Sequence, residues 1–461
     1  MLNGIKMKNL SLLFGPLIAL ALGLGLHYNG MSYEIAWTAG ITALTAVWWI
    51  FEPIPIPATS LIPLAMLPLT GVLDYKQLGA AYGDKLILLL LGGFILSTAM
   101  ERSGAHRRIA LTMVRALGGQ SPRRLVLGFM CASAFLSMWI SNSATTLMLL
   151  PIVLAVVEKT DDRRFRIALL LGVAYAASLG GIATPIGTPP NLVFIDQYTQ
   201  LTGEEPSFLN WMSWTIPITL LMIPITWLWL TRGLKKDQAL ELPEVGKWRS
   251  EEIRTLAVFA VTALLWITRK EPFGGWSELA GMPGAHDSSV ALLAVLAMFL
   301  IPNGKGEKLL DWETAKRIPW GILLLYAAGI AIARGFTSSG LSETLGESLK
   351  DITTLNIIVM MGLICLCMTF LTEITSNTAT TNVMMPVLVS MSVAGAIEPR
   401  LIMVPATISA SFAFMLPVAT PPNAVVFGAG GISVRTMARE GIILNLIGVV
   451  AVTGICYLMF G

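Results

Sequence analysis

The six residues SNSATT at positions 141–146 return as SNTATT at positions 376–381, 235 residues further along the chain. A second pair lies downstream of each copy, where TPIGTPPN at 184–191 matches LPVATPPN at 416–423 at an offset of 232. Matched motifs that recur in one order and at nearly one offset indicate an internal repeat. This repeat decides the fold that we expect.

The composition around these motifs is that of a membrane protein. Of the 461 residues, 55% are hydrophobic and 13% are charged, about half of the roughly 25% charged residues in a soluble domain. These values exclude an ordinary soluble enzyme and a disordered or collagen-like chain. The net charge of +3 does not suggest nucleic-acid binding. The four cysteines lie in apolar segments and the three histidines are scattered singly, so no disulfide or metal framework is predicted.

Apolar stretches of membrane-spanning length predict eleven crossings. The first stretch follows two lysines and could pass for a signal peptide, but no convincing cleavage site follows, so we expect a membrane helix. The predicted crossings are 11–28, 35–51, 54–69, 86–100, 165–198, 211–230, 256–268, 288–301, 320–333, 401–427 and 442–459.

Two further apolar segments, 125–157 and 355–389, are too long for one crossing, since a single helix of that length would reach about 50 Å. Arginines and lysines, including Lys159, crowd both flanks of the first segment, whereas only Lys350 and Arg400 flank the second. Basic residues accumulate on the cytoplasmic side. The first segment is therefore predicted to be a re-entrant hairpin that enters the membrane from the cytoplasm. The second is predicted to be a re-entrant hairpin that enters from outside. This topology places the N-terminus of the chain in the cytoplasm.

Each repeat would then hold five crossings and one hairpin, and an odd number of crossings turns the second copy upside down. We predict an all-α polytopic membrane protein with eleven transmembrane helices and two re-entrant hairpins in an inverted-topology repeat, the architecture of secondary transporters. The expected divisions are an N-terminal helix (1–34), a first repeat (35–231), a cytoplasmic linker (232–253) and a second repeat (254–461).

The motifs carry groups that suit ions. Hydroxyls, amides and the free N–H groups at half-helix N-termini can hold a carboxylate without an arginine. The proline-rich motifs break helices, and the backbone carbonyls that lose their helical partners suit a hard cation as ligands. The small residues Gly187 and Ala419 in these motifs let the backbone approach such a cation closely. The alternatives are helix caps and interhelical hydrogen bonds for the first pair and packing kinks for the second. The matched placement of the motifs in the two repeats favours an ion-binding site over these alternatives.

Glu373 stands directly before the second tip, where the first repeat has Met138. An acid within a membrane segment is a functional candidate, and a solvated vestibule position is the alternative.

On these paired motifs the sequence resembles the divalent anion/sodium symporter family, which includes the sodium-coupled dicarboxylate and citrate transporters, over essentially the whole chain. The resemblance implies a homodimer with a scaffold and a mobile transport domain that moves as an elevator. It also implies two sodium sites beside the tips, with substrate between them.

The resemblance assigns residues to each site. The implied first sodium site is Ser137, Ser141, Asn142 and Gly187, and the second is Thr372, Thr375, Asn377 and Ala419. The implied substrate shell is Asn142, Ser143, Thr188, Pro189, Asn377, Thr378, Thr420 and Pro421. The family commonly has Thr where this chain has Ser143, so the hydroxyl is kept and a methyl is lost. That departure leaves the size of the substrate open.

We therefore expect a sodium-coupled symporter of C4-dicarboxylates such as succinate, fumarate or malate in the cell's inner or plasma membrane, with sodium co-transported and no organic cofactor. The alternatives are a sulfate or tricarboxylate transporter of the same family, or a sodium-independent anion exchanger. An enzyme would need a cluster of titratable or metal-binding residues, which the sequence does not show. A channel is disfavoured because paired hairpins suit alternating access.

Overall fold

The computed structural model describes residues 2–118, 121–158, 162–234, 246–349 and 351–461. Over these ranges the chain is helical, and the β-structure found there is an isolated bridge between Pro302 and Lys308. Two of the flanking lysines used above, Lys159 and Lys350, and the middle of the predicted linker 232–253 lie outside the described residues.

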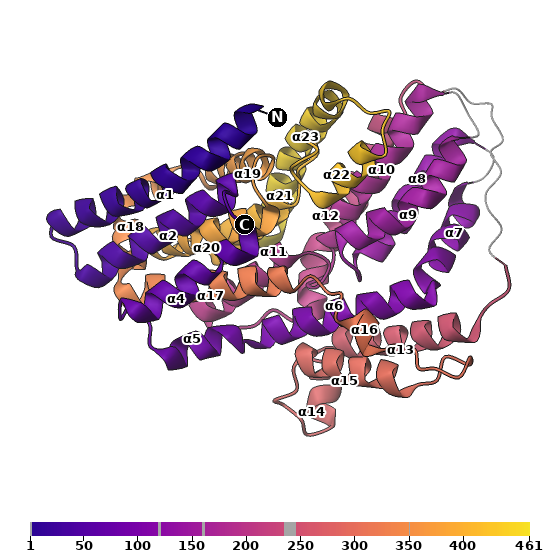
Figure 1. Ribbon diagram of the computed structural model, residues 1–461, viewed down its shortest axis with the longest axis horizontal. Helices are drawn as coiled ribbons and strands as arrows, with labels where there is room; N and C mark the ends of the chain where they lie inside the picture. The colour runs from indigo at the N-terminus through magenta and orange to yellow at the C-terminus, as the bar shows by residue number, and fades with distance from the viewer. Residues whose placement is uncertain (1, 119–120, 159–161, 235–245, 350) are drawn as a thin grey trace.

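The first half of the chain contains twelve helices in its described part (Figure 1). They are α1 (Leu2–Tyr28), α2 (Tyr33–Phe51), α3 (Ile56–Thr59), α4 (Leu61–Leu69), α5 (Tyr75–Tyr82), α6 (Lys85–Ser103), α7 (Ala105–Gly118), α8 (Pro122–Ser137), α9 (Asn142–Val157), α10 (Arg163–Gly181), α11 (Pro189–Thr202) and α12 (Phe208–Leu230).

The second half follows a similar order. Its described helices are α13 (Ser250–Ile267), α14 (Gly275–Leu279), α15 (Asp287–Leu300), α16 (Trp312–Ala315), α17 (Trp320–Ser339), α18 (Leu341–Leu349), the 3₁₀ turn η1 (Ile352–Thr354), α19 (Ile357–Thr372), α20 (Asn377–Gly395), α21 (Pro399–Ala410), α22 (Pro421–Gly428) and α23 (Val434–Phe460). Helix α13 begins four residues before the predicted boundary at 254.

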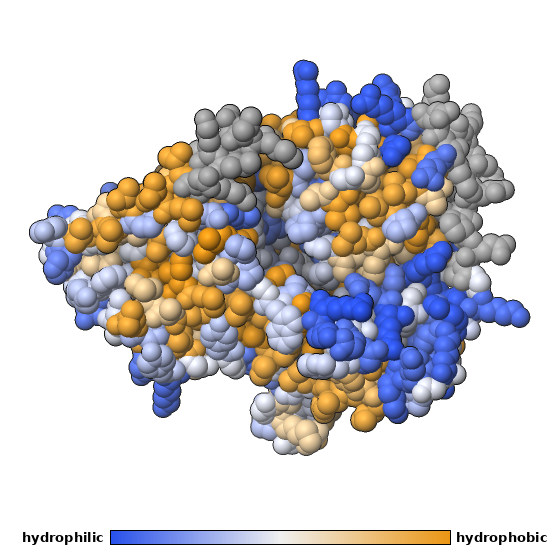
Figure 2. Space-filling model, viewed as in Figure 1, coloured by the Kyte–Doolittle hydropathy of each residue, from blue (hydrophilic) through white to orange (hydrophobic). Residues whose placement is uncertain are grey.

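Seven helical stretches in the described chain are long and apolar enough to cross a membrane by length and composition. Apolar residues cover much of the face in Figure 2, and hydrophilic residues gather around α7, α13 and α16. The chain is an integral membrane protein by these features.

Both long apolar segments are folded back on themselves at their motifs. Helix α8 ends at Ser137 and α9 begins at Asn142, while α19 ends at Thr372 and α20 begins at Asn377. Each break falls within the repeated Ser-Asn motif or directly before it. The sequence therefore interrupts both segments at equivalent positions.

Two predicted crossings are also interrupted, each by a proline-rich motif. The span 165–198 consists of α10 and α11, separated by residues 182–188, and the span 401–427 consists of α21 and α22, separated by residues 411–420. Pro189 and Pro421 occupy the first turns of α11 and α22. Proline fits this position because its fixed φ suits a helix start and the missing N–H has no intrahelical partner there.

The two halves interlock around these interruptions. Helix α11 of the first half packs against α20 of the second, and α22 of the second half packs against α9 and α10 of the first (Figure 1). The short helix after each proline motif therefore contacts a hairpin helix of the opposite half.

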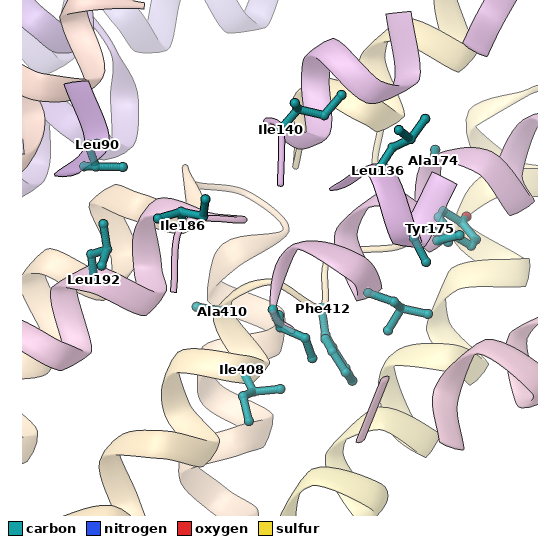
Figure 3. Close-up of a cluster of buried hydrophobic side chains, with 14 of the residues drawn as sticks. Leu90, Leu136, Ile140, Ala174, Tyr175, Ile186, Leu192, Ile408, Ala410 and Phe412 are labelled. Carbon is teal, nitrogen blue, oxygen red and sulfur yellow. The ribbon is translucent and has the colours of Figure 1, made fainter. Parts of the chain in front are cut away.

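A buried apolar cluster holds the interruptions in place, and Figure 3 shows that both halves contribute to it. Its labelled members include Leu136, Ile140, Ala174, Tyr175 and Ile186 from the first half, and Ile408, Ala410 and Phe412 from the second. The Tyr175 hydroxyl donates a hydrogen bond of 2.6 Å to the carbonyl of Phe414, and the two rings lie 4.9 Å apart. These contacts tie α10 to residues 411–420.

The helices that precede the segments 125–157 and 355–389, α7 and α18, are among those that have no counterpart in the predicted spans. The buried residues of α7 are Ala105, Arg108, Ala110, Leu111 and Val114. Their spacing places most of them on one face of the helix, and Arg108 on that face forms an ion pair with Glu252. Helix α7 packs against α8 and α18 packs against α20. Helix α7 therefore precedes the first hairpin and contacts one of its two helices, and α18 does the same for the second hairpin.

Candidate functional site

A cavity of about 780 Å³ lies where both hairpin tips and both interrupted segments meet. Figure 2 shows the visible face hollowed near its centre. The structure brings all eight residues of the predicted substrate shell to the wall of this cavity: Asn142, Ser143, Thr188, Pro189, Asn377, Thr378, Thr420 and Pro421.

Four helices of eight or more residues begin at this cavity. The first residues of α9, α11, α20 and α22 are Asn142, Pro189, Asn377 and Pro421, and all four line the wall. The first turn of a helix carries unpaired N–H groups and a partial positive charge. Among the described residues of the wall, the one ionisable side chain is Glu52. An anion in this cavity would therefore meet the dipoles of helix N-termini rather than a basic side chain.

The predicted cation residues form matching hydrogen bonds in the two halves. Ser137 Oγ donates to Asn142 Oδ1 over 2.6 Å, and Thr372 Oγ1 donates to Asn377 Oδ1 over 2.7 Å. Ser137 and Thr372 are fully buried behind the cavity wall. Each hydroxyl thus fixes the orientation of the tip asparagine five residues later.

The remaining predicted cation residues reach the cavity itself. Ser141 and Gly187 line it on one side, and Thr375 and Ala419 line it on the other. Ser141 also caps α9, where its Oγ accepts a hydrogen bond from the Ala144 N–H. Each half therefore gathers hydroxyl, amide and backbone oxygens around one tip, the ligand type that hard cations prefer.

Two further asparagines, at the end of the proline-rich motifs, close the interrupted segments. Asn191 Nδ2 donates to the carbonyls of Gly181 (3.0 Å) and Thr184 (2.8 Å). Asn423 Nδ2 donates to the equivalent carbonyls of Ala413 (2.8 Å) and Leu416 (3.0 Å). The sequence reasoning assigned neither residue a role, although their shared offset of 232 is a signal that could have identified them.

An added side chain at either of two glycines in the first interrupted segment would force a neighbour to move. A Cβ atom on Gly187 would lie 2.4 Å from the carbonyl oxygen of Gly181, and one on Gly181 would lie 2.4 Å from Asn142 Oδ1. Both distances are shorter than real Cβ contacts. Gly181 therefore belongs to the site as well, because it lets α10 approach the first tip.

Glu373 is buried, with 3% of its surface exposed, so it does not occupy a solvated vestibule. Its carboxylate accepts hydrogen bonds from the N–H groups of Met415 (2.8 Å) and Leu416 (3.0 Å) and from Asn445 Nδ2 (2.6 Å). The second hairpin is thereby tied to residues 411–420 and to α23.

Comparison with known proteins relates the chain to membrane transporters. A family model described as citrate transporter matches residues 46–405. Sodium-dependent dicarboxylate transporters SdcS of Staphylococcus aureus and Staphylococcus saprophyticus are 39% and 40% identical to this chain, each over 97% of the chain and 90% of the relative. The YdaH transporter of Alcanivorax borkumensis shares the fold at a TM-score of 0.60 and 15% identity, over 91% of this chain and 98% of that protein.

Proposed function

Because this chain belongs to the citrate transporter family, we propose that it is a secondary active transporter that moves C4-dicarboxylates together with sodium. Membership in a transporter family confirms the resemblance inferred from the paired motifs and means that the protein is not an enzyme. The names of its relatives support the substrate class and the coupling ion.

The convergence of four helix N-termini on one cavity is the observation that carries the proposal. Moving a dianion out of water costs several kcal/mol per charge even after relaxation, and neutral dipoles recover only part of that. Cations bound a few ångströms away supply the rest by Coulomb attraction in a medium of low dielectric. Sodium binding at the tips would therefore make dianion binding possible.

Each half of the chain is proposed to provide one sodium site. The first sodium ion is held by Ser137, Ser141, Asn142 and Gly187, and the second by Thr372, Thr375, Asn377 and Ala419. Substrate lies between the tips against the eight residues of the predicted shell. The matched bonds from Ser137 to Asn142 and from Thr372 to Asn377 support this assignment, because they leave each tip asparagine in a fixed orientation.

We further propose the complete architecture expected from the sequence: eleven crossings, two re-entrant hairpins, inverted repeats, a cytoplasmic N-terminus and a homodimer in the inner or plasma membrane. In that topology the end of α2 and the start of α17 lie on the cytoplasmic side. Phe51 and Pro319, at these two places, line the cavity together with the tips. The conformation described here therefore opens inward, as one end state of an elevator motion.

Uptake of radiolabelled succinate into proteoliposomes tests the proposed function. Succinate affinity is expected to rise steeply with sodium and much less with potassium, and the sodium affinity must rise by the same factor when succinate binds. Affinity that is unchanged when choline replaces sodium would leave a sodium-independent carrier. Unlabelled sulfate and citrate, added as competitors, test the two alternative substrates.

Replacing either tip asparagine tests the site. Asn142→Ala and Asn377→Ala each remove a hydrogen-bonding partner of a charged ligand, a contact worth roughly 1.5–3 kcal/mol. Substrate binding is therefore expected to weaken at least tenfold in both variants, with the elution volume of the purified protein unchanged. Asn29→Ala, in the exposed turn after α1, is the matched control. Wild-type uptake by either tip variant would remove the proposed site.

A further inference from the structure

A second pocket, of about 620 Å³, lies where the end of α6, the start of α7 and the start of α13 meet. We propose that this pocket binds a phosphate group, which either the headgroup of an anionic phospholipid or a soluble phosphate ester carries. The inference goes beyond the proposed function, because this pocket shares no described wall residue with the cavity at the hairpin tips.

The wall of this pocket is rich in positive charge. Its described residues include two carboxylates, those of Glu101 and Glu252. Against these two stand five basic side chains: Arg102, Arg107, Arg108, Lys247 and Arg249. The pocket therefore differs from the cavity at the tips, because it offers an anion basic side chains rather than the dipoles of helix N-termini.

Three of the five basic side chains are held by acidic partners. The buried side chains of Arg108 and Glu252 form an ion pair of 2.7 Å, and Arg249 approaches the same carboxylate at 2.9 Å. Arg102 pairs with two acids that lie beyond the wall, Glu307 (2.9 Å) and Asp311 (2.6 Å). These pairs hold the elements of the pocket together.

The other two basic side chains, those of Arg107 and Lys247, form no ion pair or hydrogen bond with any described residue. Both are exposed. They come from different parts of the chain, since Arg107 lies in the first turn of α7 and Lys247 lies in the segment before α13. Glu101 supplies one negative charge against these two. A positive charge therefore remains for an anion.

Buried contacts bring the two unpaired cations to one pocket. The guanidinium group of Arg108 donates to the backbone carbonyls of Gly246 (3.1 Å) and Lys247. The segment that carries Lys247 is thereby tied to α7, one residue away from Arg107. Neither contact uses the guanidinium group of Arg107 or the ammonium group of Lys247, so both groups stay available to a ligand.

The pocket lies at the boundary of the membrane. The predicted crossing 86–100 ends beside it, and the predicted crossing 256–268 begins a few residues after Arg249. The Arg108 guanidinium group lies 4.5 Å from the centre of the Trp248 ring, and Trp248 is 56% exposed. Tryptophans gather at the level of the lipid headgroups, and basic pockets between membrane helices bind anionic headgroups. This position favours a phosphate that comes from the membrane.

The size and the donors of the pocket suit a phosphate ester. Its volume of about 620 Å³ equals that of roughly twenty water molecules at about 30 Å³ each, so a phosphate fits together with the group that it esterifies. The guanidinium group of Arg107 presents a planar fork to two phosphate oxygens, and the ammonium group of Lys247 presents a point charge. A phosphate has enough acceptor oxygens to use both.

Two radiolabelled probes test the proposal on the purified full chain: phosphatidylglycerol in phosphatidylcholine-containing micelles, and glycerol phosphate, which has the same headgroup chemistry without acyl chains. The double variant Arg107→Gln, Lys247→Gln removes both unpaired charges. A basic residue near an anionic lipid strengthens binding roughly fivefold. The double variant is therefore expected to bind phosphatidylglycerol about 25-fold more weakly, with its elution volume unchanged.

The double variant Arg317→Gln, Arg435→Gln is the matched control, because both arginines are exposed, lie outside the wall and remove the same net charge. Its affinity should stay within about twofold of the wild type, since salt screens charges that are distant from the ligand. If the first variant does not fold, Arg107→Gln and Lys247→Gln are measured singly, and each is expected to bind about fivefold more weakly.

The two probes distinguish the sources of the phosphate. Binding of phosphatidylglycerol alone, with the loss in the Arg107 and Lys247 variants, assigns the pocket to a phospholipid. Binding of glycerol phosphate with the same loss assigns it to a soluble ester. Affinities that are equal in the wild type and these variants, an equal loss in the control, or binding of neither probe overturns the proposal. The measurements use no succinate and no sodium, so their outcome is independent of the proposed function.

Discussion

Single residues of the first tip are packed so closely that one methyl group should disturb ion binding. Gly181 lies against Asn142, and its added Cβ would come within 2.4 Å of Asn142 Oδ1. Gly181→Ala is therefore expected to displace the asparagine, break its bond to Ser137 and lower succinate uptake at least tenfold. The measurement is sodium-dependent uptake at equal amounts of reconstituted protein.

Gly362→Ala is the matched control for this substitution. Gly362 also lies inside a helix of a hairpin, but an added Cβ there meets no atom within 4 Å. Alanine favours a helix over glycine by about 1 kcal/mol, so this variant should fold at least as well and transport normally. Equal losses in both variants would show that loss of glycine itself, rather than the contact with Asn142, causes the defect.

At the level of elements, the interrupted segments depend on the asparagines that bridge them. Asn191→Ala leaves the buried carbonyl of Gly181 without its donor, and Asn423→Ala does the same to that of Ala413. The carbonyls of Thr184 and Leu416 each lose one of two donors, since the N–H groups of Gly187 and Ala419 also bond them. An unsatisfied buried polar group costs about 1–3 kcal/mol. Both variants should therefore unfold at a lower temperature, by similar amounts, and lose sodium-dependent succinate binding. An unchanged Tm in either one would contradict the bridging role.

The orientation of the two hairpins is a separate prediction at this scale. A single cysteine at Arg163, which follows the first hairpin, should react only with reagent added from the cytoplasm, and one at Ile352, before the second hairpin, only from outside. Labelling of both positions from one side would contradict the inverted repeat. The background lacks the four native cysteines: Cys131, Cys365, Cys367 and Cys456.

The features of the fold that occur in both repeats could be predicted from the sequence. Features without a recurring sequence motif or a long apolar run could not. The breaks before Asn142 and Asn377 were predicted because the same letters return at one offset. Helices α7 and α18 were missed because a short amphipathic helix has no long apolar run. The burial of Glu373 was left open because its bonds come from Met415 and Asn445, which are distant in sequence and carry no motif of their own.

Across the whole molecule, an ionic cluster joins the connection between α11 and α12 to the rest of the protein. Glu205 forms ion pairs with Lys85, at the start of α6, and with Arg269 (3.5 Å), and its Oε1 lies 2.9 Å from His286 Nε2. The cluster therefore stabilises the conformation described here.

The stability that this cluster provides should depend on pH. Burial alone would raise the pKa of Glu205, but hydrogen bonds from His286 and Lys85 lower it by more, so the pKa lies well below its usual value of 4.5. A carboxyl with a lowered pKa adds stability above its unfolded pKa and loses it as the pH falls below that value. The Tm of the wild type should exceed that of Glu205→Gln at pH 7, and the difference should shrink below about pH 4.5.

Glu204→Gln is the control for this measurement, since Glu204 is the exposed neighbour of Glu205. Its Tm should follow that of the wild type at every pH. A Tm difference between the wild type and Glu205→Gln that stays constant from pH 7 to pH 4 would show that the ionised carboxylate is not what stabilises this conformation.

The makeup of the cavity wall also has a pharmacological consequence. In the proposed site, helix N-termini and amides would hold the anion, and Glu52 is the one ionisable side chain among the described residues of the wall. An inhibitor with two carboxylates would compete only where sodium is abundant, so its potency would differ between culture media.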